Sequence, residues 1–437
     1  MKKYTTYTSK IAAATPADRN RIVDFWRALA ILVVVFGHWL AASIWLTPSG
    51  DVQLMNSLEW VPGAGWLTWL VQVMPVFFLA GGYANARALR RVALGEEPRH
   101  EWIAARMRRL FTPVLPLLAV WVALIVAIRG LIPHDIVWAG AMAATVPLWF
   151  MAVYLVLVAL APFTYRWWQQ RGAVSIGALF GAAIFVDILR LGFGIPLIGW
   201  VNFLFAWAGI HQVGYLWSDL DRRGIAARTG WIVAGASLGT LILLTAIGVY
   251  PVAMLGIPGS ALTNVTPPTF AIALLGGMQL GVIWGTQGLV RRFTDSFRGW
   301  HAVVSLSGII MTVYLWHLTA MALVGAAGLS LFGGTAFSVE PGTAVWWLSR
   351  PLWLAVLASV TLGLIALFAR FEWRINTRPA PATIAVILGL VLTVGTTAAV
   401  AVQGLATTTA HVRWLIPSAA ALGATLVGAL PRRATAR

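Results

Sequence analysis

The 437 residues are 59% hydrophobic and 10% charged, and they include no cysteine. So little charge excludes a soluble globular chain of this size, and the lack of thiols excludes disulfides, thiolate catalysis and cysteine-based zinc sites. The formal net charge is +17, but the arginines stand in short segments between apolar runs, without an aromatic-interleaved basic domain. We therefore expect this charge to set membrane topology, and we expect no nucleic-acid partner.

Apolar runs of 18 or more residues recur along the chain, and each can cross a bilayer as a helix. They are continuous and do not alternate with period two, which excludes a membrane β-barrel. The first run is too long for a signal-peptide core, so we expect it to be a retained span. We predict twelve spans, at 26–46, 64–86, 110–129, 137–162, 173–190, 196–217, 229–249, 268–290, 302–330, 346–369, 380–404 and 413–430.

The distribution of positive charge supports this arrangement. With the N-terminus inside, 27 of the 31 lysines and arginines fall in segments predicted to be cytoplasmic, as the positive-inside rule requires. The predicted outer loops, 47–63, 250–267 and 331–345, are rich in Pro, Gly, Thr and Ser. The predicted fold is an all-α polytopic integral membrane protein of about twelve spans with both termini cytoplasmic.

Arg27 and His38 are the first candidates for chemistry. They are eleven residues apart, so on a helix they share one face and are separated by about 16 Å along the axis. Arg27 then lies at the cytoplasmic headgroup level and His38 lies about halfway across the membrane or somewhat beyond. An ionisable side chain at that depth predicts a functional site; the alternative is a neutral histidine hydrogen-bonded between helices.

The first span, "RIVDFWRALAILVVVFGHWL", resembles the opening helix of the membrane-bound acyltransferase-3 family. That family carries an Arg-x10-His signature with an aspartate three residues before the arginine, matched here by Asp24, Arg27 and His38. Further segments resemble the family in order: "MPVFFLAGGYANA" from Met74, "RMRRLFTPVLPL" from Arg106, "PLWFMAVYLVLVALAP" from Pro147, "VYLWHLTA" from Val313 and "ARFEWR" from Ala369. One departure is that Ala80-Gly81-Gly82-Tyr83 stands where the family has a serine.

The resemblance covers residues 20–375 and implies a division of the chain. Residues 1–25 would be a cytoplasmic N-terminal segment, and 26–375 a ten-helix acyltransferase-3-like membrane domain. Residues 376–437 would add two C-terminal spans and a short basic tail.

The resemblance also implies acyl transfer across a membrane, which we expect to be the inner (plasma) membrane of a bacterium. The donor would be cytoplasmic acyl-coenzyme A, acetyl in most of the family, used as a co-substrate with no bound cofactor. The acceptor would be a hydroxyl of a glycan, glycolipid or secondary metabolite. His38 would act as the catalytic base or would carry the acyl group as a nucleophile, and the sequence leaves both routes open.

Arginines on the predicted cytoplasmic side suit the phosphates of such a donor, because a guanidinium binds phosphate through two parallel hydrogen bonds. The alternative is that they only hold their loop inside. Asp24 would orient Arg27, or would form a simple ion pair at the helix end. The predicted donor-binding residues are Arg27, Arg87, Arg90, Arg106, Arg108 and Arg109.

Two more groups of residues are weaker candidates. His317, with Tyr314 three residues before it, lies mid-span like His38, so it would support the site or make a structural hydrogen bond. Asp187 and Arg190 would contact the acceptor at the outer face, or would form a structural ion pair.

Other classes of function fit the sequence less well. No HExxH or other zinc-ligand spacing occurs, and we expect no metal site. A transporter or flippase of a lipid-linked glycan or small solute is the alternative function, but the sequence shows no inverted repeat with paired broken helices.

Overall fold

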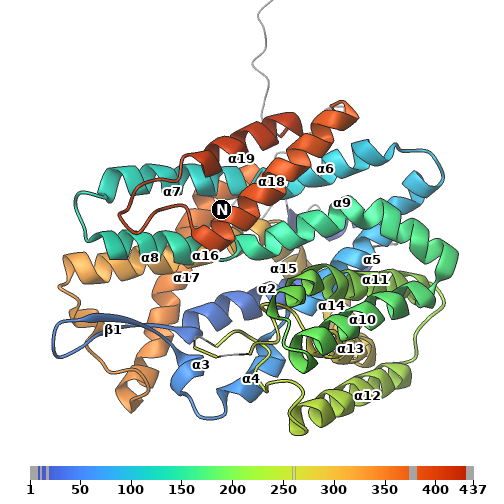
Figure 1. Ribbon diagram of the computed structural model, residues 1–437, viewed down its shortest axis with the longest axis horizontal. Helices are drawn as coiled ribbons and strands as arrows, with labels where there is room; N and C mark the ends of the chain where they lie inside the picture. The colour runs from blue at the N-terminus through green and yellow to red at the C-terminus, as the bar shows by residue number, and fades with distance from the viewer. Residues whose placement is uncertain are drawn as a thin grey trace, which may run out of the picture. The chain divides into compact units, whose positions relative to one another are not determined.

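The computed structural model describes residues 8–9, 12–15, 19–257, 259–260, 262–373 and 381–429. The residues that it describes are 76% helical (Figure 1), and the chain is an all-α polytopic membrane protein. It divides into two compact units, which are described one at a time. Unit 1 comprises Met1–Gly37, Asn56–Ala93 and Leu160–Gly308, and unit 2 comprises His38–Met55, Leu94–Ala159 and Ile309–Arg437.

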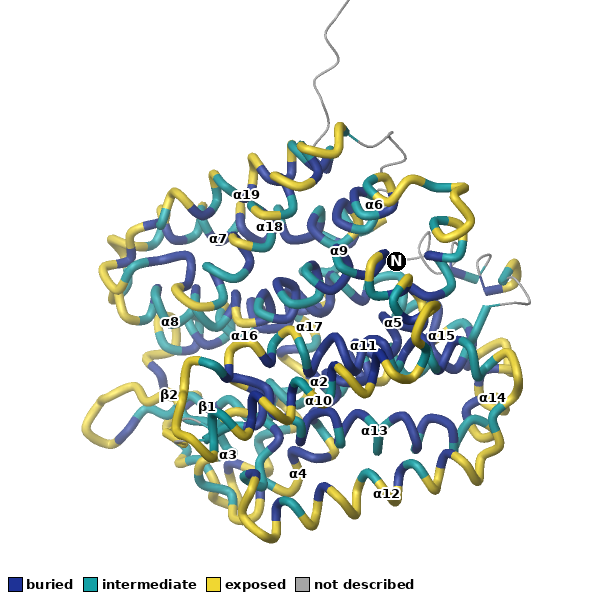
Figure 2. Tube along the Cα trace, turned by 45° about the vertical axis from the view of Figure 1, so that its right-hand side comes forward, coloured by how far each residue is buried: buried dark blue, intermediate teal, exposed yellow. Residues whose placement is uncertain are grey.

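In unit 1, helix α5 packs on α11, α12 packs along α13, and α10 packs on α11. Helix α12 has a largely exposed face (Figure 2). Only 17% of its 18-residue apolar stretch is buried, as expected for a helix that faces lipid. The elements are α2 (Arg21–Ala41, as far as Gly37), α3 (Ser57–Trp60), α4 (Ala64–Val71), α5 (Met74–Ala93), α9 (Leu148–Arg171, from Leu160), α10 (Ala173–Asp187), η1 (Ile188–Gly192), η2 (Pro196–Val201), α11 (Asn202–Asp221), α12 (Ala227–Ala246), α13 (Phe270–Gly285), α14 (Gln287–Asp295) and α15 (Phe297–Ser307).

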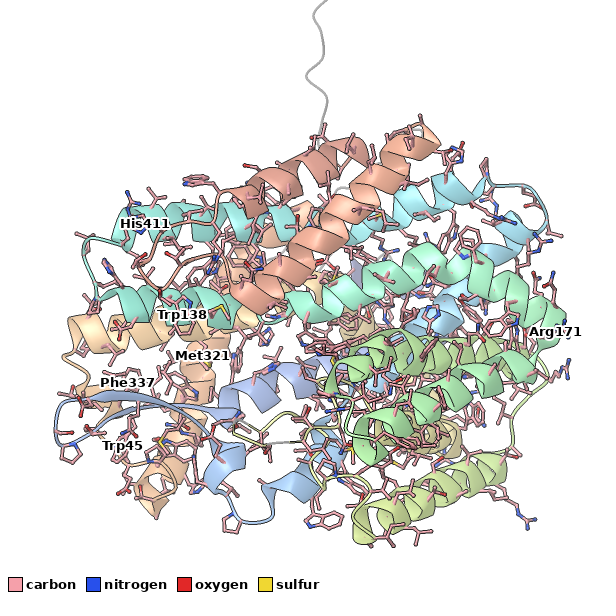
Figure 3. All side chains as sticks on the ribbon, in the orientation of Figure 1. Trp45, Trp138, Arg171, Met321, Phe337 and His411 are labelled. Carbon is pink, nitrogen blue, oxygen red and sulfur yellow. The ribbon has the colours of Figure 1, made fainter. Side chains whose placement is uncertain are left out.

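In unit 2, helix α16 packs against α17 and α8, and α18 packs against α19. Figure 3 labels Trp138 on α8 and Met321 on α16, the two helices of one of these pairs. Besides the end of α2 and the start of α9, the elements are β1 (Ala42–Leu46), β2 (Val52–Asn56), α6 (Arg99–Phe111), α7 (Val114–Ile128), α8 (His134–Thr145), α16 (Ile310–Leu331), η3 (Thr335–Phe337), α17 (Ala344–Trp373), α18 (Thr383–Gln403) and α19 (Leu415–Leu426).

The first predicted span, 26–46, is wrong at its C-terminal end. Helix α2 begins at Arg21 and ends at Ala41, and the next five residues form strand β1, which pairs with β2. The turn between the strands is closed by Thr47 N–H donating to the Asp51 carbonyl at 2.9 Å, with Gly50 at φ 90°. Because β1 contains Ile and Trp before a Pro-Ser-Gly turn, its composition suits a hairpin better than a helix end. His38 therefore lies in the last turn of α2.

Nine helices of the described residues are long and apolar enough to cross a membrane, or ten if the pair α13–α14, bent by 56°, is one span. Two predicted spans are not among them. Span 196–217 corresponds mainly to α11, which carries Asn202, His211 and Gln212, and span 413–430 corresponds to α19, which has only 12 residues. The total of twelve spans and the cytoplasmic termini stay predictions. Eight of the basic positions used for the predicted topology lie outside the described residues: Lys2, Lys3, Lys10, Arg374, Arg378, Arg432, Arg433 and Arg437.

The contact between α5 and α11 depends on glycine. A Cβ atom on Gly82 would lie 1.9 Å from the His211 carbonyl oxygen, and one on Gly214 would lie 2.3 Å from the Leu79 carbonyl oxygen. Small residues allow such close approach of two membrane helices. The contact also explains how helix α11 accommodates its polar side chains, because α11 packs inside unit 1. There Asn85 forms a hydrogen bond with His211, and Ser175 forms one with Gln212.

Gly82→Ala should lower the apparent melting temperature of the purified protein by several degrees. The added methyl group overlaps main-chain atoms that cannot move without shifting a helix, an overpacking cost of about 1–3 kcal/mol. Gly235→Ala on α12 is the matched control, because its Cβ would meet nothing within 4 Å. Equal melting temperatures for the two variants in a thermal unfolding assay would contradict the close contact.

Candidate active site

His38 and His317 meet inside unit 2. The Nδ1 atom of His38 lies 3.0 Å from Nε2 of His317, and the two ring centroids are 5.1 Å apart with a tilt of 32°. His317 is fully buried, whereas His38 is half-buried. The structure thus brings together the two histidines that the sequence placed on separate helices, 279 residues apart.

Indole hydrogen bonds hold the helices that carry the two histidines. Trp39, next to His38, donates from Nε1 to the His317 carbonyl at 3.0 Å. Trp353 of α17 donates to the Trp39 carbonyl at 2.9 Å, and Trp121 of α7 donates to the Thr319 hydroxyl at 3.0 Å. Each bond satisfies a polar group in an apolar interior, where an unmet one would be costly. These tryptophans were not among the predicted site residues.

Tyr314 helps to hold α16, the helix that carries His317. Its hydroxyl donates to the Pro147 carbonyl at 2.6 Å, in the junction between α8 and α9. Its own carbonyl oxygen lies 2.7 Å from Nδ1 of His317. Tyr314 therefore contacts His317 through its main chain, while its side chain holds the α8–α9 junction.

Glu372 caps the N-terminus of α16. One carboxylate oxygen accepts from Met311 N–H at 3.1 Å, and the other accepts from Thr312 N–H at 2.9 Å and from the Thr312 hydroxyl at 2.7 Å. These N–H groups have no partner within the helix, and the positive end of the helix dipole favours a carboxylate there. The segment "ARFEWR", which resembles the family, contains this glutamate, but Glu372 was not among the predicted site residues.

Arg27 and Asp24 lie in the unit 1 part of α2, which begins after Asn20 caps it by accepting from the N–H groups of Ile22 and Val23. Asp24 Oδ1 is 3.7 Å from Arg27 NH1, whereas Asp24 Oδ2 accepts from Arg19 Nε at 2.7 Å. Asp24 is thus shared between two arginines, and its shorter bond goes to Arg19. Arg19 was missed because it precedes the helix and carries no periodic signal.

The predicted donor-binding arginines of the basic segment belong to two elements of different units. Arg87 and Arg90 lie on α5 in unit 1, where Arg87 donates to the Tyr83 hydroxyl at 3.3 Å. That hydroxyl donates in turn to Asp221 at 2.7 Å.

The other three arginines lie on α6 in unit 2. Arg106 stacks over the Trp102 ring, with its guanidinium carbon 5.0 Å from the centroid, and Arg109 interacts electrostatically with Glu372. Arg108 is buried, so it is the least accessible of the three. Anion binding by these arginines stays a prediction.

Asp187 is buried in unit 1, where its carboxylate accepts several hydrogen bonds. It accepts from Asn202 at 2.9 Å, from the Tyr250 hydroxyl at 2.8 Å and from Phe270 N–H at 2.8 Å. Burial and the Asp187 charge raise the pKa of Tyr250, which keeps its phenol protonated as a donor. Arg190 donates to the Pro267 carbonyl at 3.3 Å. Contact of Asp187 and Arg190 with an acceptor and an ion pair between the two residues both stay predictions.

The chain has several helices long enough to span a bilayer, so it is a polytopic membrane protein. The two imidazoles in contact inside unit 2 form a site suited to proton transfer. Residues 20–368 match a family model described as an acyltransferase domain. The chain belongs to the acyltransferase-3 family and is a membrane acyltransferase. No curated protein matches the chain, and no solved structure matches it.

Glu372→Gln should destabilise the N-terminus of α16 by about 1 kcal/mol, because a neutral amide loses the attraction to the helix dipole and one accepting oxygen. The measurement is the apparent melting temperature of the purified protein. Glu340→Gln removes an exposed carboxylate and is the matched control. A fall of the same size in both variants would show that the carboxylate of Glu372 does not stabilise this helix end.

Proposed function

We propose that this acyltransferase moves an acetyl group from cytoplasmic acetyl-coenzyme A to a hydroxyl of a glycan, a glycolipid or a related secondary metabolite. Its place would be the inner membrane of a bacterium, with the basic segments on the cytoplasmic side. The observation that carries the proposal is the 3.0 Å contact between His38 and His317. It provides an imidazole pair, with His317 buried and His38 half-buried, that is able to take and return a proton during transfer.

His38 is the proposed catalytic residue. As general base, it takes the proton of the acceptor hydroxyl while that oxygen attacks the thioester carbonyl, the carbon–sulfur bond breaks, and the coenzyme A thiolate receives the proton. In the second route the His38 imidazole attacks the thioester, the carbon–sulfur bond breaks and coenzyme A leaves as the thiol with the imidazole proton. The acceptor hydroxyl then attacks the acyl group, the acyl–nitrogen bond breaks, and the hydroxyl proton returns to the imidazole. Incubation with acetyl-coenzyme A without an acceptor separates the routes, because only the second adds one acetyl group to the intact mass.

Arg27 is the proposed phosphate contact for the donor. It stands eleven residues before His38 on the continuous helix α2, about 16 Å away along the axis. That separation lets one end of an extended donor reach the imidazole while its phosphates meet the guanidinium. The Asp24 carboxylate, 3.7 Å from Arg27 NH1, helps to fix the guanidinium orientation.

His38→Ala should reduce thiol release from acetyl-coenzyme A at least 100-fold in nanodiscs supplied with candidate acceptors, because a positioned base contributes about 10²–10⁴ in rate. The variant should keep the wild-type melting temperature to within a few degrees. His134→Gln changes an exposed histidine and is the control. Full activity of His38→Ala with an acceptor that the wild type uses would refute the assignment.

Arg27→Lys should raise the KM for acetyl-coenzyme A about tenfold with little change in kcat, because an ammonium group cannot bind phosphate through a planar fork. Initial rates at varied donor concentration measure this. Arg298→Lys is the control, since Arg298 is an exposed arginine of α15. A change in kcat alone would place Arg27 in the reaction itself and not in donor binding.

A further inference from the structure

Three polar groups of unit 2 form one hydrogen-bonded line: the Tyr314 carbonyl, the His317 imidazole and the His38 imidazole. His317 Nδ1 lies 2.7 Å from the Tyr314 carbonyl oxygen, and His317 Nε2 lies 3.0 Å from His38 Nδ1. The order of these groups determines where the protons must be, because the first of them can only accept.

The tautomer of His317 follows from its first bond. A carbonyl oxygen has no proton to give, so Nδ1 of His317 must be the donor. His317 is fully buried among apolar helices, where a charged imidazole without a counter-ion is costly, so the ring is neutral. A neutral imidazole with a proton on Nδ1 has its lone pair on Nε2.

The tautomer of His38 follows from the second bond. Because His317 Nε2 accepts, the proton between the rings belongs to His38 Nδ1, and the lone pair of neutral His38 is on Nε2. We infer that His317 is a positioning residue, which holds His38 in the Nδ1–H form and makes Nε2 the nitrogen that reacts. Only the reaction that Nε2 performs rests on the proposed function; the tautomer itself does not.

The surrounding bonds make this arrangement rigid. Trp39 donates to the carbonyl of His317, so the residue beside one histidine is tied to the main chain of the other. The bond from Trp353 to the Trp39 carbonyl ties α17 to the same point. Rotation of the His317 ring would break two hydrogen bonds at once in an interior that offers no water to replace them.

A neutral imidazole partner gives the pair a different net charge from the one that a carboxylate partner would give. When His38 Nε2 takes the acceptor proton, the pair gains one positive charge, which the bond to His317 Nε2 stabilises. That charge disappears when the proton passes to the coenzyme A thiolate. With both rings neutral, the resting pair has no charge.

The direct experiment is the ¹⁵N spectrum of histidine-labelled protein in lipid nanodiscs without substrate. Protonated and unprotonated ring nitrogens differ widely in ¹⁵N shift, and the signals of His38 are those lost in His38→Gln. We expect Nδ1 of His38 to be protonated and Nε2 to be unprotonated. A proton on Nε2 of neutral His38 would overturn the inference, whatever the activity of the protein.

Two variants test whether His317 is the cause. His317→Gln keeps an oxygen that can accept near the position of Nε2, so the Nδ1–H form of His38 should persist and part of kcat should return. His317→Leu offers no acceptor, so His38 should shift towards the Nε2–H form, and kcat should fall about 100-fold or more while the donor KM stays unchanged. His134→Gln is the control for both readouts.

The outcomes separate the inference from the proposed function. An unchanged His38 spectrum in His317→Leu would overturn the role of His317 even if the enzyme is active. The expected spectra in a protein that consumes no acyl-coenzyme A would uphold the tautomer and refute the proposed reaction.

Discussion

Unit 2 depends on one constraint: an imidazole buried among apolar helices needs partners for both of its nitrogens. His317 meets this requirement with the Tyr314 carbonyl on one side and His38 on the other. The need for partners joins α16 to the last turn of α2, which belongs to unit 2, and the bond from the Trp39 indole to the His317 carbonyl joins the same two segments. Because each bond lies where water is scarce, the loss of one leaves a polar group unsatisfied, which gives the pair a defined geometry.

Unit 1 accommodates buried polar groups in a different way, by burying most of one helix. α11 carries Asn202, His211 and Gln212 and is too polar to face lipid. Its polar groups instead form hydrogen bonds with α5 and α10. Glycine contacts bring α11 and α5 close enough for the bond between them to form. A helix of this kind is stabilised by its neighbours, so its mean hydropathy says little about whether it crosses the membrane.

The sequence predicted the helical class and the candidates His38, His317 and Arg27, because ionisable residues within apolar runs stand out. It could not predict the bond between the histidines, which depends on how the last turn of α2, within unit 2, packs against a residue 279 positions later in the chain. The hairpin after α2 was hidden because the apolar run continues through β1, and hydropathy does not distinguish a strand from a helix end. The second partner of Asp24, Arg19, lies before the helix, where periodicity gives no signal.

The carboxylate that caps α16 and the imidazole that α16 carries have separate tasks along this helix. Glu372 bonds its first N–H groups, where the helix dipole compensates a negative charge, and His317 lies between one and two turns further on, with a neutral partner. In the predicted topology α16 runs from the cytoplasmic side outward, so the charge lies near the membrane surface and the neutral pair lies deeper. An aspartate in place of His317 would strengthen the basicity of His38, but it would bury a charge at the more costly depth. A histidine there gives a weaker base that can rest uncharged inside the membrane.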